Sequence, residues 1–487
     1  MLGADGDAEQ PSYVELQAQI AERDARIAQL EGKLERMLAL LLEARARLSK
    51  NSRNSSKPPS SEGLSKPPAD KKKNKRSLRR PSGRKPGGQE GHEGAHLQRA
   101  EVPDDEIAHE PECCDGCGGT LRDAERLSER EESRQVFDLP EQIALQVIEH
   151  TALRRLCEGC GKLSAGRFPV GVDAPVSYGP RIRALAVYLH VFQHLPYDRA
   201  RQLMLDTFRA DISTATIKAW VDRAGGGLSD FDEQLRKLLL HEPVVNFDET
   251  GARIAGQLGW VHSASTEKLT RYTVHAQRGV QAMNCAGVLP DFKGIAVHDG
   301  WKPYQNYEQA THALCAGHHL RELLAASEAG QGWASQMSAL LLGANETAQR
   351  AQAALSQQAL SDLQARYRAV IALGYEQNPG LAADAHKRIK RTDAQNLLLR
   401  LDQREHEALR FAHDLRVPFT NNLAERDIRM VKLQQKISGS WRTDGGAQRW
   451  MAVRSYISSA RKQGQRPLEV LAKLASGEPW MPAPAPG

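Results

Sequence analysis

The sequence has few aromatic residues, only 5% of its 487 residues, and no uninterrupted run of 18 apolar residues. The missing apolar run argues against a membrane-spanning helix. The first ten residues are acidic, whereas a signal peptide needs a basic start followed by an apolar stretch. We therefore expect a cytoplasmic protein. The 40% of apolar and 26% of charged residues are typical of a soluble protein with some solvated parts.

The net charge of +6 is concentrated in one segment. Residues 51–86 contain 12 Lys and Arg against Glu62 and Asp70, so they carry +10 and the remainder of the chain carries −4. This stretch is rich in Ser and Pro and has too few apolar residues to fold alone, which predicts a disordered linker. A charged segment that merely stays solvated is the alternative. Binding to DNA phosphates would use its cations, among them Lys71, Lys72, Lys73, Arg79 and Arg80.

The N-terminal segment carries a heptad-like pattern. Apolar residues recur in alternating steps of four and three from Leu16 to Leu48, interrupted at Arg23, and Glu, Arg and Gln fill the other positions. This spacing predicts a coiled coil through which the chain forms a homo-oligomer. An amphipathic helix packed on its own domain is the alternative.

Four cysteines form two CxxCG pairs. Cys114 and Cys117 make the first pair, and Cys157 and Cys160 follow after 39 intervening residues. Zn²⁺ favours four thiolates delivered by two tight turns, so the pattern predicts a zinc ribbon with one structural Zn²⁺. Disulfides are the alternative, which a reducing cytosol disfavours. Cys113 could replace Cys114 as a ligand.

The next segment reads as helical and contains a possible helix-turn-helix. Its second helix would begin after Ser213 as the N-cap and would present Lys218 to DNA. Many helical bundles show the same pattern, so a purely structural role is equally open. Three glycines, beginning at Gly225, are expected to form a hinge before the following domain.

Two apolar runs are predicted to be strands that end at carboxylates. The stretch VVNFDETG places Asp248 and Glu249 after one run, and KGIAVHDGW places Asp299 after the other. In open sheets, functional side chains gather at the carboxyl ends of buried strands. Alternation puts Asp248 on the face of Asn246 and turns Glu249 elsewhere, so Asp248 is the better candidate. A turn leading into a hairpin is the alternative for the first stretch.

A third carboxylate lies in a basic segment. Between residues 416 and 466 there are 11 Lys and Arg but only three acids, and one of these, Glu425, follows a helix start at Thr420 or Asn421. An acid in such surroundings suits a metal site that handles phosphates, whereas an exposed ion pair is the alternative. The cations of this segment expected to contact DNA are Arg426, Arg429, Lys432, Lys436 and Arg442.

The motifs DETG, HDGWKPY, HHLREL and NNLAERDIRMVKLQQKISGSWRT closely resemble the insertion sequence 66 family of bacterial transposases, specifically its large subunit. The coil, the NSRNSSKPPS tract and the CxxCG pairs resemble the same family. The resemblance implies an RNase H-like fold with an Asp, Asp, Glu (DDE) triad, matched here by Asp248, Asp299 and Glu425, and a helical insertion before the Glu. It also implies a nucleoid-associated protein whose partners are DNA, as element ends and target, and small accessory proteins encoded by the same element.

Three carboxylates suffice to hold two divalent metal ions for in-line attack on a phosphodiester. Asp248 would bridge both ions, and Asp299 and Glu425 would each complete the shell of one. Oxygen ligands, with no His or Cys set evident at the site, favour Mg²⁺, or Mn²⁺ in its place. His318 and His319 are expected to be packed at a helix start, with a phosphate contact as the alternative.

These expectations combine into a multidomain α+β protein that acts as a DNA transposase, cleaving and joining strands. A non-catalytic zinc-ribbon DNA-binding protein and an RNase H-like nuclease or resolvase are the alternatives, and strand joining separates the last from a transposase. The predicted units are a coiled coil (1–50), a basic linker (51–100), a zinc ribbon (101–175), a helix-turn-helix-like domain (176–235), an RNase H-like α/β core with a helical insertion (236–440, insertion 329–411), and a basic helical segment with a Pro-rich tail (441–487).

Overall fold

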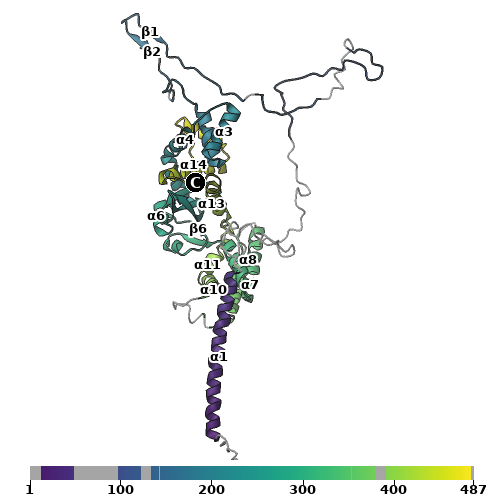
Figure 1. Ribbon diagram of the computed structural model, residues 1–487, viewed down its shortest axis with the longest axis vertical. Coiled ribbons are helices and arrows are strands. Elements are labelled where there is room, and N and C mark those ends of the chain that lie inside the picture. The colour runs from purple at the N-terminus through teal and green to yellow at the C-terminus, as the bar shows by residue number, and fades with distance from the viewer. Residues whose placement is uncertain are drawn as a thin grey trace, which may run out of the picture.

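The computed structural model describes residues 12–48, 97–121, 133–141, 143–169, 171–351, 354–379, 381 and 391–483. The predicted linker cations Lys71, Lys72, Lys73, Arg79 and Arg80 lie outside these residues. Helix α1 (Tyr13–Leu48) is continuous (Figure 1). Leu16, Leu30 and Leu41 on this helix are 43%, 51% and 66% exposed. The helix therefore carries the expected seam, and its pairing with a second chain stays a prediction.

A five-stranded sheet with the order β5-β4-β3-β6-β7 forms the centre of the fold (Figure 1). Strands β3 (Val244–Ile254), β4 (Gln257–Ser265) and β5 (Thr270–His275) are antiparallel neighbours. Strands β6 (Ile295–His298) and β7 (Thr311–Leu314) run parallel to β3. This mixed sheet with many helices is compatible with the nuclease-like core that the resemblance implies.

Strand β3 continues past Asp248, although the sequence pattern predicted that it ends there. Its antiparallel pairing with β4 extends to Ile254. The hairpin turn lies at Ala255 and Gly256, whose φ values of 49° and 78° suit the two-residue turns that match the twist of paired strands. Parallel pairing with β6, however, ends at Asn246. Asp248 therefore lies just beyond the end of the parallel pairing, while β3 itself continues in antiparallel pairing with β4.

Helices that precede and follow the sheet in the sequence share one hydrophobic core with its antiparallel part. Side chains of these helices and of β3, β4 and β5 contribute to this core. The helices are α2 (Pro180–Val187), which continues as a π-helical turn (Tyr188–Phe192), α3 (Tyr197–Phe208), α4 (Thr214–Gly226), α5 (Ser229–His241), α13 (Asn422–Ser438), α14 (Asp444–Lys462) and α15 (Pro467–Ala475).

Gly225 and Gly226 lie inside α4 and not in a hinge, which corrects the sequence-based expectation. A Cβ atom at Gly225 would come within 2.6 Å of backbone and side-chain atoms of Arg449 in α14. Glycine is needed there because the two helices approach closely. At the other end of α4, the side chain of Ser213 accepts a hydrogen bond from the backbone N–H of Thr216, as expected for its N-cap.

A second hydrophobic core lies beside the parallel strands. Strand β6 joins the two cores, because Ala296 faces the first and its neighbours Ile295 and Val297 face the second. The helices of this part are α7 (Ala316–Glu328), α8 (Gly332–Arg350), α9 (Gln357–Glu376), α10 (Asp393–Gln403), α11 (Glu405–Ala408) and α12 (Arg410–His413). The remaining elements are β1 (Arg154–Leu156), β2 (Leu163–Ala165), α6 (Val280–Ala286) and the 3₁₀ helices Leu289–Asp291 and Lys302–Asn306.

Candidate active site

Three neighbouring strands bring polar side chains to one edge of the sheet. Asn246 of β3 and Val297 of β6 form the last pair of this parallel ladder, so Asp248 and Asp299 each follow that pair by two residues. Cys315 directly follows β7, and its backbone N–H donates to the His298 carbonyl at 2.8 Å. The sheet thus gathers these side chains through parallel pairing.

Glu425 reaches this edge from the first turn of α13, and Asn421 fixes the start of that helix. Asn421 stands at the N-cap position, but its side chain does not cap the helix. Its amide Nδ2 donates to the Phe247 carbonyl at 2.7 Å, and its Oδ1 accepts from Asn246 Nδ2 at 2.8 Å. Its backbone N–H donates to Cys315 Sγ at 3.1 Å. This buried residue therefore ties α13 to both β3 and the end of β7.

The carboxylates are close enough to affect one another's ionisation. Burial raises the pKa of Asp248 well above its usual range, and the charges of Glu249, Glu425 and Asp299 raise it further. The Glu249 N–H, which donates to Asp248 Oδ1 at 2.9 Å, opposes this effect. Asp299 Oδ1 accepts from the Trp301 N–H at 2.8 Å. Asp248 is thus a half-buried acid whose ionisation the two other acids of the predicted triad oppose.

Glu249 has partners of its own. Its side chain is 2% exposed, and its carboxylate lies 2.6 Å from a guanidinium nitrogen of Arg278 and 2.7 Å from the Tyr304 hydroxyl, which donates to it. The Arg278 guanidinium in turn lies 3.7 Å from the centre of the Trp301 ring. Glu249 is therefore occupied by a cation and a hydroxyl, in agreement with the strand alternation that favoured Asp248 as the functional acid.

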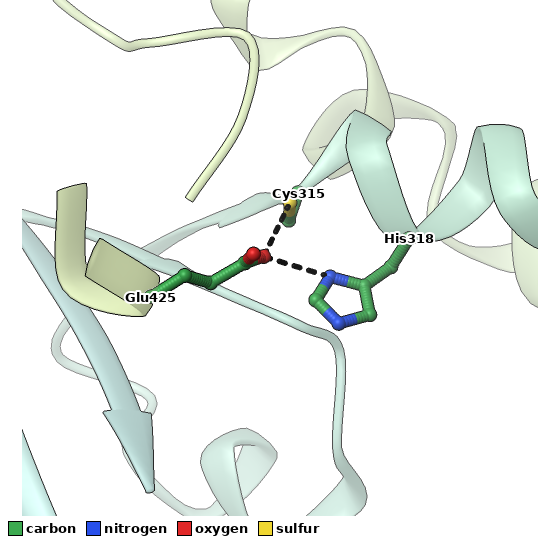
Figure 2. Close-up of side chains that lie close together, drawn as sticks. All are labelled: Cys315, His318 and Glu425. Atoms are coloured by element: carbon green, nitrogen blue, oxygen red, sulfur yellow. Dashed lines mark hydrogen bonds and ion pairs between the residues drawn. The ribbon is translucent and has the colours of Figure 1, made fainter. Parts of the chain in front are cut away.

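Figure 2 shows that Glu425 points toward Cys315 and His318. Glu425 Oε1 lies 3.6 Å from His318 Nδ1 and 4.0 Å from Cys315 Sγ. The expectation that no His or Cys set stands at the site is therefore wrong, because β7 pairs beside β6 and delivers both residues to the same edge. The signal in the sequence was CAGHH directly after the residues THAL, which form β7. Burial raises the pKa of the Cys315 thiol to about 11.

The three groups of Figure 2 have their ligand atoms within 4.8 Å of one another. They are the only such group of three or more His, Cys, Asp or Glu within the described part of the chain, so the three triad carboxylates do not converge as tightly. Arg321 lies nearby, with a guanidinium nitrogen 3.8 Å from Glu425 Oε1. His319 is packed inside the helix start, where burial lowers its pKa to about 3.

Each CxxC pair has a tight turn. The Gly118 N–H donates to the Cys114 carbonyl, and the Gly161 N–H donates to the Cys157 carbonyl, both at 2.8 Å. A backbone hydrogen bond from Gly116 lowers the pKa of Cys114, and one from Cys160 lowers that of Cys157. Across the described residues, these thiols are not brought into one group of three or more ligand atoms. The joining of the two turns by Zn²⁺ stays a prediction.

The predicted DNA-contacting cations within the described ranges lie on two surfaces. Lys218 on α4 forms an ion pair with Asp222. The second surface is the exposed face of α13, where Arg426, Arg429 and Lys436 recur in steps of three or seven and are exposed. The other two predicted contacts, Lys432 and Arg442, are exposed as well. A row of cations thus runs along the helix that carries Glu425.

Comparison with known proteins identifies the region that holds this site. The family model described as "Transposase IS66 family" matches residues 175–449, which contain the sheet, α13 and all the carboxylates discussed above. A model for a family of unknown function (DUF6444) matches residues 8–98. No curated protein matches the chain. None of the helices in the described ranges is long and apolar enough to cross a membrane. Since the first match covers more than half of the sequence, the chain belongs to the IS66 family of transposases.

Proposed function

We propose that this transposase binds the ends of an insertion sequence and catalyses DNA strand cleavage and strand transfer through Asp248, Asp299 and Glu425. Family membership supports a transposase that has DNA as its partner and uses divalent metal ions. The observation that supports the finer assignment is that Asp248 and Asp299 both follow the last pair of the parallel ladder, together with the Asn421 contacts that hold the first turn of the Glu425 helix against β3.

The residues fit a pair of divalent cations. Asp248 is half-buried, the charges of neighbouring carboxylates raise its pKa, and Arg278 is paired with Glu249. Asp248 would contact both ions, with Asp299 on one and Glu425 on the other, and Mg²⁺ or Mn²⁺ suits such oxygen ligands. When bound, the ions supply stabilisation of the attacking and leaving oxygens in an in-line displacement.

The chain's own residues position these groups and the DNA. Asn421 holds the first turn of α13 at a fixed distance from β3. Arg278 and Tyr304 engage the Glu249 carboxylate, which leaves Asp248 as the acid of this pair proposed to hold the metal ions. In this proposal the exposed cations of α13 contact DNA phosphates, which positions the DNA without reading its bases.

Segments outside the core have supporting roles in this proposal. The basic linker and the predicted zinc ribbon would add contacts to DNA. Helix α1 would join two or more copies of the chain, because its exposed apolar seam is what a coiled coil buries. Small accessory proteins from the same element are further proposed partners.

Strand transfer with labelled element ends tests the proposal. With Mg²⁺ or Mn²⁺, Asp248→Asn, Asp299→Asn and Glu425→Gln should each reduce cleavage and joining by orders of magnitude while DNA binding is retained. The matched control is Glu308→Gln, an exposed acid outside the site that should react at the parental rate. Glu249→Gln should retain more activity than Asp248→Asn. Parental cleavage in any of the three triad variants would refute the triad, and cleavage without joining would favour the nuclease alternative.

A further inference from the structure

The thiol and imidazole beside Glu425 are unusual neighbours for a carboxylate that is to hold Mg²⁺. Cys315 Sγ and His318 Nδ1 belong to one turn at the start of α7, and both atoms face Glu425 Oε1 (Figure 2). His318 Nδ1 is buried and has no hydrogen-bond partner. The oxygen, nitrogen and sulfur atoms therefore converge on one point, and the nitrogen is left free to bind something there.

We propose that Cys315, His318 and Glu425 form a second metal site, which takes a thiophilic divalent cation such as Zn²⁺ and thereby withdraws Glu425 from the catalytic metal. This inference rests on the proposed role of Glu425. Zn²⁺ binds Cys, His and carboxylate ligands in tetrahedral sites, whereas Mg²⁺ avoids sulfur and nitrogen. Zn²⁺ would thus act as an inhibitor of the Mg²⁺-dependent reaction.

The spacing of the three atoms supports such a site. Ligands about 2.0–2.3 Å from a tetrahedral Zn²⁺ lie roughly 3.3–3.6 Å apart from one another. The observed 3.6 Å from oxygen to nitrogen lies at the top of this range, and the 4.0 Å from oxygen to sulfur exceeds it by a few tenths of an ångström. Small side-chain rotations would close the site, with water as the fourth ligand.

The surroundings also suit a bound thiolate. The Asn421 backbone N–H already donates to Cys315 Sγ, as amides do to metal-bound sulfur, and binding of the cation would release the thiol proton to solvent. One thiolate and one carboxylate together balance a divalent charge. Arg321, 3.8 Å from Glu425, is 28% exposed and has room to turn outward when a cation replaces it.

Binding of Co²⁺ to the metal-free full-length chain tests this site without a catalytic readout. Co²⁺ bound to thiolate gives a charge-transfer absorption, which reports the number of Co²⁺ equivalents bound per chain. The parent and each variant are compared in this number. Cys315→Ser and His318→Gln should each bind one equivalent less than the parent at the same free Co²⁺. The matched control Cys285→Ser removes an exposed thiol far from this group in sequence and should bind as the parent does.

The CxxCG thiols bind the same amount of Co²⁺ in the parent and in every variant, so their contribution cancels when the bound equivalents are subtracted. Asp248→Asn should keep the full Co²⁺ signal even though it abolishes cleavage, which separates this site from the proposed catalytic function. In strand-transfer reactions with Mg²⁺, the Zn²⁺ concentration that gives half inhibition should rise by more than about 100-fold in Cys315→Ser. This is more than the loss of metal affinity expected when a residue that only contacts a ligand is replaced. Equal Co²⁺ binding by parent, Cys315→Ser and His318→Gln would overturn the proposal, and if Cys315→Ser does not fold, His318→Gln alone decides it.

Discussion

Replacement of Asn421 by Ala should cost both stability and activity, because this buried side chain fixes the first turn of α13 on β3. The truncation removes two hydrogen bonds and leaves the Phe247 carbonyl and the Asn246 amide without this partner. Asn246 and Asn421 are 3% and 1% exposed, so water does not readily replace the lost bonds. Each buried polar group left unsatisfied costs about 1–3 kcal/mol, so we expect a loss of roughly 2–6 kcal/mol in the free energy of unfolding.

The expected effect on catalysis follows from the same contacts. Glu425 lies one helical turn beyond Asn421, and its backbone N–H donates to the Asn421 carbonyl at 3.1 Å. Without the side-chain clamp, the carboxylate is free to shift relative to Asp248. A displacement of about 1 Å in such a site costs on the order of 100-fold in rate. Strand cleavage should therefore fall under conditions in which the variant is still folded.

Urea unfolding followed by tryptophan fluorescence measures the first effect, because Trp441 and Trp450 are buried with their rings 5.3 Å apart beside α13. The matched control is Asn422→Ala at the next position, which is exposed and should change the unfolding free energy by less than about 0.5 kcal/mol. Equal unfolding curves for Asn421→Ala and Asn422→Ala, together with parental cleavage, would refute the clamp.

Four further predictions concern other parts of the chain. Purified protein should contain about one Zn²⁺ per chain beyond any at Glu425, and Cys157→Ser with Cys160→Ser should remove it; zinc retained in that double variant would exclude the ribbon. Deletion of residues 66–86 should lower DNA affinity and flatten its salt dependence but keep the preference for element ends. A lost preference with an unchanged salt slope would contradict this. Deletion of residues 13–48 should reduce the oligomer mass in light scattering, and an unchanged mass would place the interface elsewhere. Finally, the raised pKa of Asp248 means that the folded chain holds this proton more strongly than the unfolded chain, so the metal-free parent loses stability as pH rises above the acid range and Asp248→Asn does not. The stability gap between them should widen from pH 4 to pH 7, and a gap that narrows would show that Asp248 is stabilised as a carboxylate.

The positions of Asp248 and Asp299 could be predicted because their signals are local. Each follows a short apolar run, and alternation along β3 separates Asp248 from Glu249. The end of β3 was predicted wrongly because the hairpin turn at Ala255 and Gly256 is not the common Asn-Gly pair, whereas the acids ahead of Gly251 resemble a turn. Local sequence thus located the acids but not the extent of the strand.

Features that depend on distant pairing could not be read from the sequence. Cys315 meets Glu425 only because β7 pairs with β6 and α13 then crosses the end of β3. Glycine is needed at position 225 because Arg449 of α14 lies against it, and this residue is close in space but distant in sequence. The sequence alone therefore suggested a hinge. Such contacts are set by the packing of whole elements, for which short motifs carry no signal.

The two aspartates and the glutamate of the proposed triad are held by different structural elements. Asp248 and Asp299 both follow the last pair of the parallel ladder, Asp248 within β3 and Asp299 directly after β6. Glu425 comes from a helix whose first turn the Asn421 side chain fixes on β3, and a thiol and an imidazole lie next to its carboxylate. Because the aspartates offer oxygen alone, they discriminate little among divalent cations that accept oxygen ligands. We therefore infer that, in the proposed scheme, the choice between a catalytic and an inhibitory cation would fall to Glu425, whose position the Asn421 clamp sets.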